Sequence, residues 1–159
     1  MLAAGVPELI VVAGATPDAV RNAVLFRDRR VQVVENPDWK SGQLSSLLAG
    51  LNAPARMPLE AVLVTLVDVP LVAVKTVECL LRVWRETRAP IVRPARGDEH
   101  GHPVIFDCAI FEALRQADPT AGAKAVVRAH EHSIVNVPVD DEGAFQDFDT
   151  PDEYARIVL

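Results

Sequence analysis

Three aspartates stand where a carboxylate could do chemistry. Asp68 ends the most apolar run of the chain, within Thr65-Leu66-Val67-Asp68-Val69-Pro70. A buried carboxylate is costly unless it is paired, and a divalent cation that bridges to phosphates is one such partner. Asp147 and Asp149 alternate with Phe148, so in an extended segment both carboxylates point to one side. Together the three predict a Mg²⁺ site, whereas a loop cap at Asp68 and a turn acid at Asp149 are the structural alternatives.

A polar loop, 36–42, leads into the start of a predicted helix. Side chains of Gln43, Ser45 and Ser46, with the free backbone N–H groups after Gly42, could hold an anion or contact the edge of a base. An ordinary helix cap accounts for the same residues. The loop is therefore a candidate binding segment with a plain structural alternative.

The histidines form two pairs, His100-Gly101-His102 and His130-Glu131-His132. A zinc site would need a further Cys or acid at ligand spacing, and none is present, so loop polarity and a helix end explain them more simply. The sequence also lacks the glycine-rich signatures of dinucleotide-binding folds and P-loop NTPases, and the GxSxG of serine hydrolases. These classes are excluded.

The elements that must position the acids alternate between short apolar runs and helix-period segments. Strands are predicted at 9–12, 31–34, 61–67, 90–93, 103–106 and 134–139, and helices at 16–26, 44–52, 74–87, 110–116 and 123–130. Thr150 to Glu153 has the pattern of a capping box that opens a short terminal helix. Such alternation predicts an α/β fold with a mostly parallel sheet, whose ligands bind at the carboxyl ends of the strands.

Composition indicates one globular domain. The chain has 159 residues, of which 50% are hydrophobic and 24% charged, with a net charge of −6. That charge argues against nucleic-acid or anionic-membrane surfaces. Cys79 and Cys108 lack CxxC spacing, no run is long enough to span a membrane, and the first residues lack the basic start of a signal peptide. We expect a cytoplasmic protein.

Four ordered motifs carry a resemblance to a known family. They are NPDWKSGQLSSLLAGL at 36–51, LVTLVDVP at 63–70, GHPVIF at 101–106 and DFDTPDEY at 147–154. In this order the chain resembles the MobA-like nucleotidyltransferases, and within them the molybdenum cofactor cytidylyltransferases. The resemblance covers nearly the whole chain. It implies a Rossmann-like three-layer α/β sandwich of the nucleotide-diphospho-sugar transferase type.

The resemblance also implies roles for individual residues. Asp68 and Asp147, with Asp149 nearby, would bind Mg²⁺; the segment from Gly42 to Ser46 would lie against the base of CTP. Gly101, His102 and Pro103 would border a molybdopterin-type substrate, with Lys124 where the family has Arg. The implied reaction is attack of a pterin phosphate on the α-phosphorus of the nucleoside triphosphate, which releases pyrophosphate. A molybdoenzyme or its maturation chaperone is the implied protein partner.

The chain departs from the family at its beginning. The family's first strand is followed by a loop whose glycines, Arg and Lys hold the triphosphate, whereas here Leu9 to Val12 correspond to the second strand. We therefore expect one domain over 1–159 that lacks the first βα unit, about 30–40 residues, with the neighbours of that internal strand left unpaired and catalysis impaired. Alternatives are a non-catalytic pterin-binding or partner-binding module, and a transferase that uses GTP or a sugar 1-phosphate.

Overall fold

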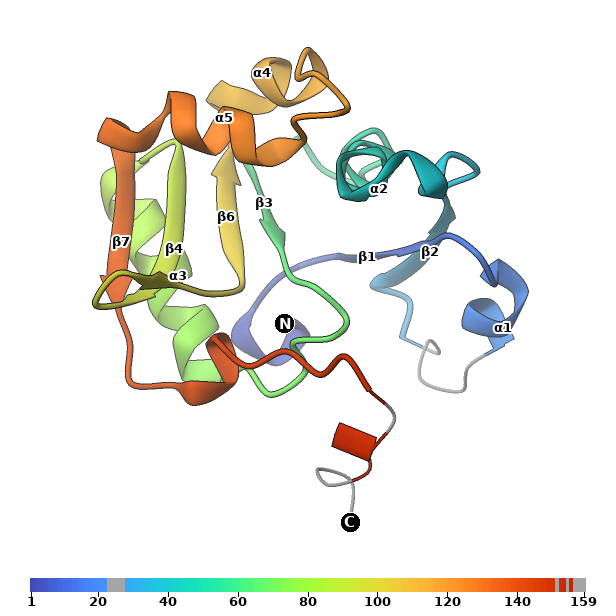
Figure 1. Ribbon diagram of the computed structural model, residues 1–159, viewed down its shortest axis with the longest axis horizontal. Coiled ribbons are helices and arrows are strands. Elements are labelled where there is room, and N and C mark those ends of the chain that lie inside the picture. Colours follow the sequence, from blue (N-terminus) through green and yellow to red (C-terminus); the bar gives the residue numbers. More distant parts are fainter. Residues whose placement is uncertain (23–27, 151, 154, 156–159) are drawn as a thin grey trace.

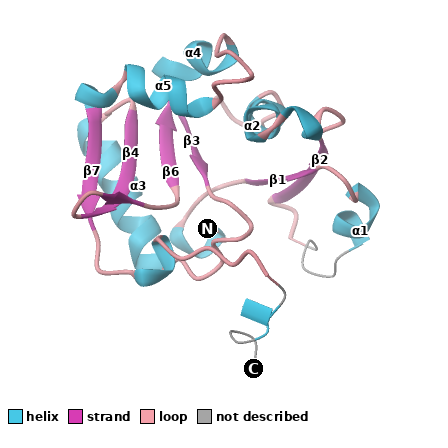
Figure 2. Cartoon of the chain, in the orientation of Figure 1, coloured by secondary structure: helices cyan, strands magenta, loops and turns pink. Residues whose placement is uncertain are grey.

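The computed structural model describes residues 1–159 apart from 23–27, 151, 154 and 156–159. The strands are β1 (Leu9–Ala13), β2 (Val31–Glu35), β3 (Ala61–Val64), β4 (Ile91–Arg96), β5 (Glu99–His100), β6 (Val104–Asp107) and β7 (Ile134–Pro138). The helices are α1 (Pro17–Asn22), α2 (Gln43–Leu51), α3 (Val74–Thr87), α4 (Phe111–Arg115) and α5 (Ala123–Ala129). The predicted alternation is confirmed (Figures 1 and 2), although the end of the first predicted helix falls outside the described residues. In the described ranges no helix is long and apolar enough to cross a membrane.

The strands form two separate sheets. β1 and β2 make a parallel pair, whereas the others form a mixed sheet in which β3, β6, β4 and β5 are successive neighbours and β7 pairs with β4. β4 and β7 are parallel, but β6 runs antiparallel to both β3 and β4. The prediction of a mostly parallel sheet is thus only partly right, because an apolar run indicates a strand but not its direction.

Each of the two sheets has an edge strand with a single partner. Among the described strands, β1 pairs only with β2, and β3 pairs only with β6. All of β3 and the first four residues of β1 are half-buried, although continuous apolar runs are typical of strands covered on both faces. Both strands are therefore edge strands among the described residues.

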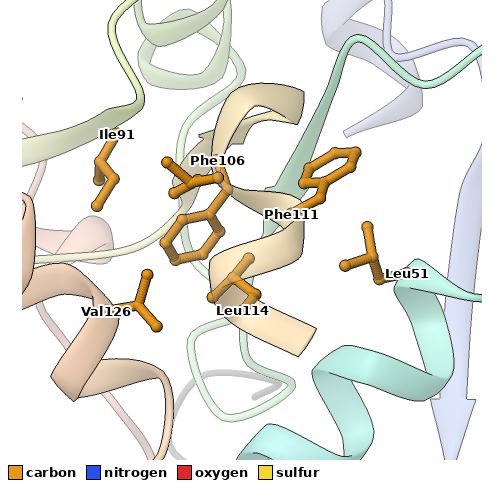
Figure 3. Packing of buried hydrophobic residues seen from close by; sticks show 7 residues of the cluster. Leu51, Ile91, Phe106, Phe111, Leu114 and Val126 are labelled. Carbon is orange, nitrogen blue, oxygen red and sulfur yellow. The ribbon is translucent and has the colours of Figure 1, made fainter. Parts of the chain in front are cut away.

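Two hydrophobic clusters cover the faces of the mixed sheet. On one face Leu80 and Trp84 of α3 pack against Val92 and Ile105. On the other, helices α2, α4 and α5 pack against Ile91 and Phe106 (Figure 3) through Leu51, Phe111, Leu114 and Val126. Successive strand residues thus point into opposite clusters, which gives the predicted three layers. Each buried side chain stabilises the fold by about 1.5–3 kcal/mol.

β3 is shorter than predicted. The sequence pattern extends it to Val67, but pairing ends where Val64 meets Val104 of β6. The next residue back along β6 is Pro103, which has no N–H to continue the ladder. Residues 65–72 are therefore free to form the loop that carries Asp68.

Candidate active site

The loop after β3 places Asp68 at the edge of the mixed sheet. The carboxylate is half-buried, and its Oδ1 is buried with no hydrogen-bond partner in the described structure. Two more buried polar atoms at these strand ends, Oγ1 of Thr65 and Nδ1 of His102, also lack partners there. Unsatisfied buried polar atoms are rare in proteins, so three of them along one rim indicate a surface that receives a ligand.

The Gly101-His102-Pro103 segment borders the same rim. Gly101 N–H donates to the carbonyl of Pro94 (3.1 Å), and His102 N–H donates to the carbonyl of Ala144 (2.7 Å). A side chain at Gly101 is excluded, because a Cβ there would lie 2.1 Å from the Ala144 oxygen. The peptide bond between His102 and Pro103 is cis. Close backbone packing therefore fixes the ring of His102 at this edge.

Local surroundings also affect His100, which is exposed at the end of the hairpin that precedes this segment. Desolvation, and then the nearby positive charge of Arg93, lower the pKa of its imidazole. Both effects disfavour the protonated imidazolium form of His100.

The segment that carries Asp147 lies along the loop of Asp68. Phe148 N–H donates to the carbonyl of Asp68 at 2.9 Å. Gly143 packs against Leu71 so closely that a Cβ would lie 2.2 Å from its carbonyl oxygen. Because Phe148 makes this backbone bond to Asp68, Asp147 and Asp149 flank the point of contact in the chain.

The predicted carboxylate trio is not assembled as a metal site. Asp147 and Asp149 are exposed, and among the described residues no three His, Cys, Asp or Glu side chains form a cation-binding group. Glu153 accepts hydrogen bonds from Thr150 and from the Asp149 N–H, so the capping box is confirmed and Asp149 belongs to it. The same finding leaves the two histidine pairs without a zinc site among those residues.

The hydroxyls of Ser45 and Ser46 hold their own loop together. Buried Asn36 donates from Nδ2 to Ser45 Oγ (2.8 Å) and Ser46 Oγ (3.0 Å), and its Oδ1 accepts from Asp38 N–H (3.0 Å). Gly42 has φ 102°, which favours glycine, and Gln43 is exposed at the start of α2. Sequence reasoning missed the role of Asn36, which the Asn-Pro-Asp turn pattern could have signalled.

Lys124 lies away from the acids. It is exposed on α5, which crosses the mixed sheet at the end where β7 begins (Figure 1). β3 points the same way as β7, since β6 runs antiparallel to β3 and β4 while β7 is parallel to β4. Asp68, which follows the end of β3, is therefore at the opposite edge, and the structure does not bring Lys124 to it.

Comparison with known proteins decides the family. Residues 1–134 match the family model described as the MobA-like NTP transferase domain. The chain belongs to the MobA-like NTP transferase family. The family that the sequence resembled is thus confirmed, and the described fold agrees with those of solved nucleotidyltransferases.

Individual relatives differ in what their names state. The chain is 32% identical over 164 residues, 99% of its length, to the nicotine blue oxidoreductase of Paenarthrobacter nicotinovorans, of which the match covers 78%. It is 29% identical to Rv0371c of Mycobacterium tuberculosis in complex with manganese, with a TM-score of 0.72 over 97% of this chain and 79% of that one. Molybdopterin-guanine dinucleotide biosynthesis protein A of Archaeoglobus fulgidus shares the fold, with 18% identity and a TM-score of 0.61 over 92% and 75% of the two chains.

The residues at the rim suit a divalent cation. The unpartnered oxygen of Asp68 is buried, the Thr65 hydroxyl is a further oxygen without a partner, and Asp147 is close along the adjoining segment. Hard oxygen donors of this kind are the ligands that Mg²⁺ and Mn²⁺ prefer. Because the protein offers few carboxylates, the remaining ligands would be water and substrate oxygens.

Proposed function

We propose that this chain carries the metal and acceptor sites of a nucleotidyltransferase that transfers CMP from CTP to the phosphate of a molybdopterin-type cofactor with Mg²⁺. One observation carries the proposal. The half-buried Asp68, with an unpartnered carboxylate oxygen, is bonded through its carbonyl to the segment that bears Asp147. Family membership supplies the reaction class, and the motifs of the cytidylyltransferase branch support CTP.

In this reaction an oxygen of the acceptor phosphate bonds to the α-phosphorus of CTP as the bond to pyrophosphate breaks. Asp68 and Asp147 would hold the cation, which would supply positive charge to neutralise the triphosphate. Gly42 and Gln43 lie toward the base, and the 101–103 segment orients the acceptor. No side chain forms a covalent bond to substrate, so the protein acts by positioning and by charge stabilisation.

The triphosphate itself is bound by a further βα unit that inserts between β1 and β3. Support comes from the two unpaired strand edges and from the lack of a glycine-rich phosphate loop in the chain. Because those groups are missing, the chain alone binds Mg²⁺·CTP weakly, and a protein that includes the unit binds it tightly.

Calorimetry with Mg²⁺·CTP and Mg²⁺·GTP measures which nucleotide binds and how tightly. It is done on this chain and on the chain extended by the in-frame coding sequence that precedes Met1. Paramagnetic resonance of Mn²⁺ tests the metal. Asp68→Asn should weaken Mn²⁺ binding about tenfold or more, the equivalent of about 1.4 kcal/mol, whereas Asp140→Asn, an exposed aspartate beyond β7, should not. Unchanged Mn²⁺ affinity in Asp68→Asn, or no nucleotide binding by an extended chain with the Gly-, Arg- and Lys-bearing loop, overturns the proposal.

Other outcomes point to the alternatives. A stop codon directly before Met1, with pterin but no nucleotide bound, favours a binding module; tighter binding of GTP, or turnover of a sugar 1-phosphate, favours another transferase. The relative named nicotine blue oxidoreductase makes redox activity a second candidate, supported by 32% identity over nearly the whole chain. Bleaching of nicotine blue, followed by absorbance with and without a reductant, measures it directly.

A further inference from the structure

A carboxylate outside the proposed metal pair caps a distant helix. α3 begins at Val74, directly after Ala73, whose methyl group cannot accept a hydrogen bond. The Oδ2 of Asp141, 68 residues further along, accepts from the Ala73 N–H at 2.9 Å and also from the hydroxyl of Thr76. In a capping box the third helical residue supplies this acceptor to the cap N–H. Here Asp141 supplies it from another part of the chain.

Asp141 is also the first of three contacts between its segment and the loop of Asp68. Asp141 meets Ala73, Gly143 packs on the carbonyl of Leu71, and Phe148 N–H bonds to the carbonyl of Asp68. Residue numbers rise on one side as they fall on the other, so the two segments run antiparallel. Loss of the contact between Asp141 and Ala73 would therefore change the position of Asp147 relative to Asp68.

The physical setting makes this contact a firm one. Thr76 is 3% exposed, Asp141 is half-buried, and hydrogen bonds to an ionised acceptor are roughly twice as strong as neutral ones. The anion also lies at the N-terminus of a helix of 14 residues, where the helix dipole favours negative charge. Exposed Asp147, by contrast, has no side-chain hydrogen bond within the described structure, so its place depends on the backbone anchors.

We propose that Asp141 is a positioning residue that holds Asp147 beside Asp68 by clamping the segment 141–148 to the start of α3. Its meaning for catalysis rests on the proposed function, whereas the clamp is a property of the metal-free chain. It acts through the backbone and touches neither cation nor substrate.

Amide hydrogen exchange of the metal-free protein tests the clamp. In Asp141→Ala, exchange of the Phe148 and His102 amides should accelerate about tenfold or more relative to the Val92 amide in the centre of the mixed sheet. Asp141→Asn keeps an acceptor oxygen and should stay within about threefold of the wild type. Asp140→Ala, a matched change of the preceding exposed acid, should leave all three amides unchanged.

Equal acceleration of all three amides, or none at Phe148, overturns the clamp. If Asp141→Ala does not fold, Thr76→Val removes one donor at similar volume and should give a smaller acceleration confined to Phe148 and His102. Mn²⁺ binding separates the two proposals. If Asp68→Asn binds Mn²⁺ like the wild type while Asp141→Ala accelerates exchange at Phe148, the clamp stands and the proposed function fails. If Asp68→Asn loses Mn²⁺ affinity while Asp141→Ala leaves exchange at Phe148 unchanged, the proposed function stands and the clamp fails.

Discussion

The apolar start of β4, Ile91-Val92, and the apolar strand β1 have different surroundings in this molecule. In β4, Ile91 and Val92 are fully buried, whereas in β1 the residues from Leu9 to Val12 are all half-exposed. Both are runs of the branched apolar residues that favour strands. Burial thus follows from the neighbours that a strand finds and not from its own sequence.

β4 has more neighbouring elements than β1. β4 lies between β6 and β7, with α3 on one face and a second cluster on the other, whereas β2 is the one strand that pairs with β1 among the described residues. Helix α2 joins the two regions: Leu51 belongs to the cluster of the mixed sheet, while Gly50 faces Val12 of β1. We infer that the two-stranded sheet opens more readily than the mixed sheet and that α2 transmits stability between them.

The largest expected difference comes from matched isoleucines. Ile91→Ala should reduce the free energy of unfolding by about 2–5 kcal/mol, because it leaves a cavity between packed layers. Ile10→Ala, in half-exposed β1, should cost about 1 kcal/mol, because water already reaches the site. Urea unfolding followed by circular dichroism measures both. Equal losses would show that β1 is as well covered as β4.

Buried polar groups give the next comparison. Asp107 accepts from Trp84 Nε1 (2.9 Å) and from the Ala109 N–H (2.9 Å) in the mixed-sheet region, so Asp107→Ala leaves buried donors unpaired and should cost about 2–3 kcal/mol. Asn36 donates to two serine hydroxyls that can turn toward other partners or water. Asn36→Ala should therefore cost only about 1 kcal/mol. A greater loss for Asn36→Ala, by the same urea assay, would contradict this ranking.

Sequence reasoning succeeded where the determinants are local. The strands, the helices and the capping box of Thr150 and Glu153 follow from apolar period and cap residues, and the structure contains them. Asp68 was singled out because an acid after the most apolar strand is unusual, and its role stays a prediction. The Gly101 position could be singled out from the family motif, and its close approach to Ala144 explains why glycine is needed.

What failed depends on distant partners. Nothing in Val104 to Asp107 indicates that β6 runs antiparallel to its neighbours, and the polar Glu99–His100 strand exists only because Arg96 and Ala95 pair with it. The use of Ser45 and Ser46 by Asn36, and the capping of α3 by Asp141, join residues whose proximity only the fold creates. That Asp68, Asp147 and Asp149 act together on a cation stays a prediction, because their spacing in the chain does not fix their separation in space.

A smaller effect tests the link through α2. A Cβ at Gly50 would lie 3.2 Å from Val12 Cγ2, which is slightly tight, but half-buried β1 can shift by a few tenths of an ångström. Because alanine favours a helix interior over glycine by about 1 kcal/mol, Gly50→Ala should stabilise the protein by roughly 0.5 kcal/mol. In a Val12→Ala background the gain should be larger. A net loss in thermal unfolding, rescued by Val12→Ala, would mean that β1 is held as rigidly as β4.

The smallest effect concerns acid sensitivity of the two-stranded sheet. The side chain of Arg30 donates to the carboxylate of Asp28, just before β2, and lowers its pKa from 3.8 to about 2. Since this pKa is lower in the folded protein, the stabilisation is present above about pH 4 and is lost as the pH falls toward 2. Asp28→Asn should remove that dependence, so amide exchange at Val33 should vary less between pH 4 and 2, after correction for intrinsic rates. Because an exposed pair acts locally, Val92 should hardly respond; an equal change there would mean that the two sheets open as one unit.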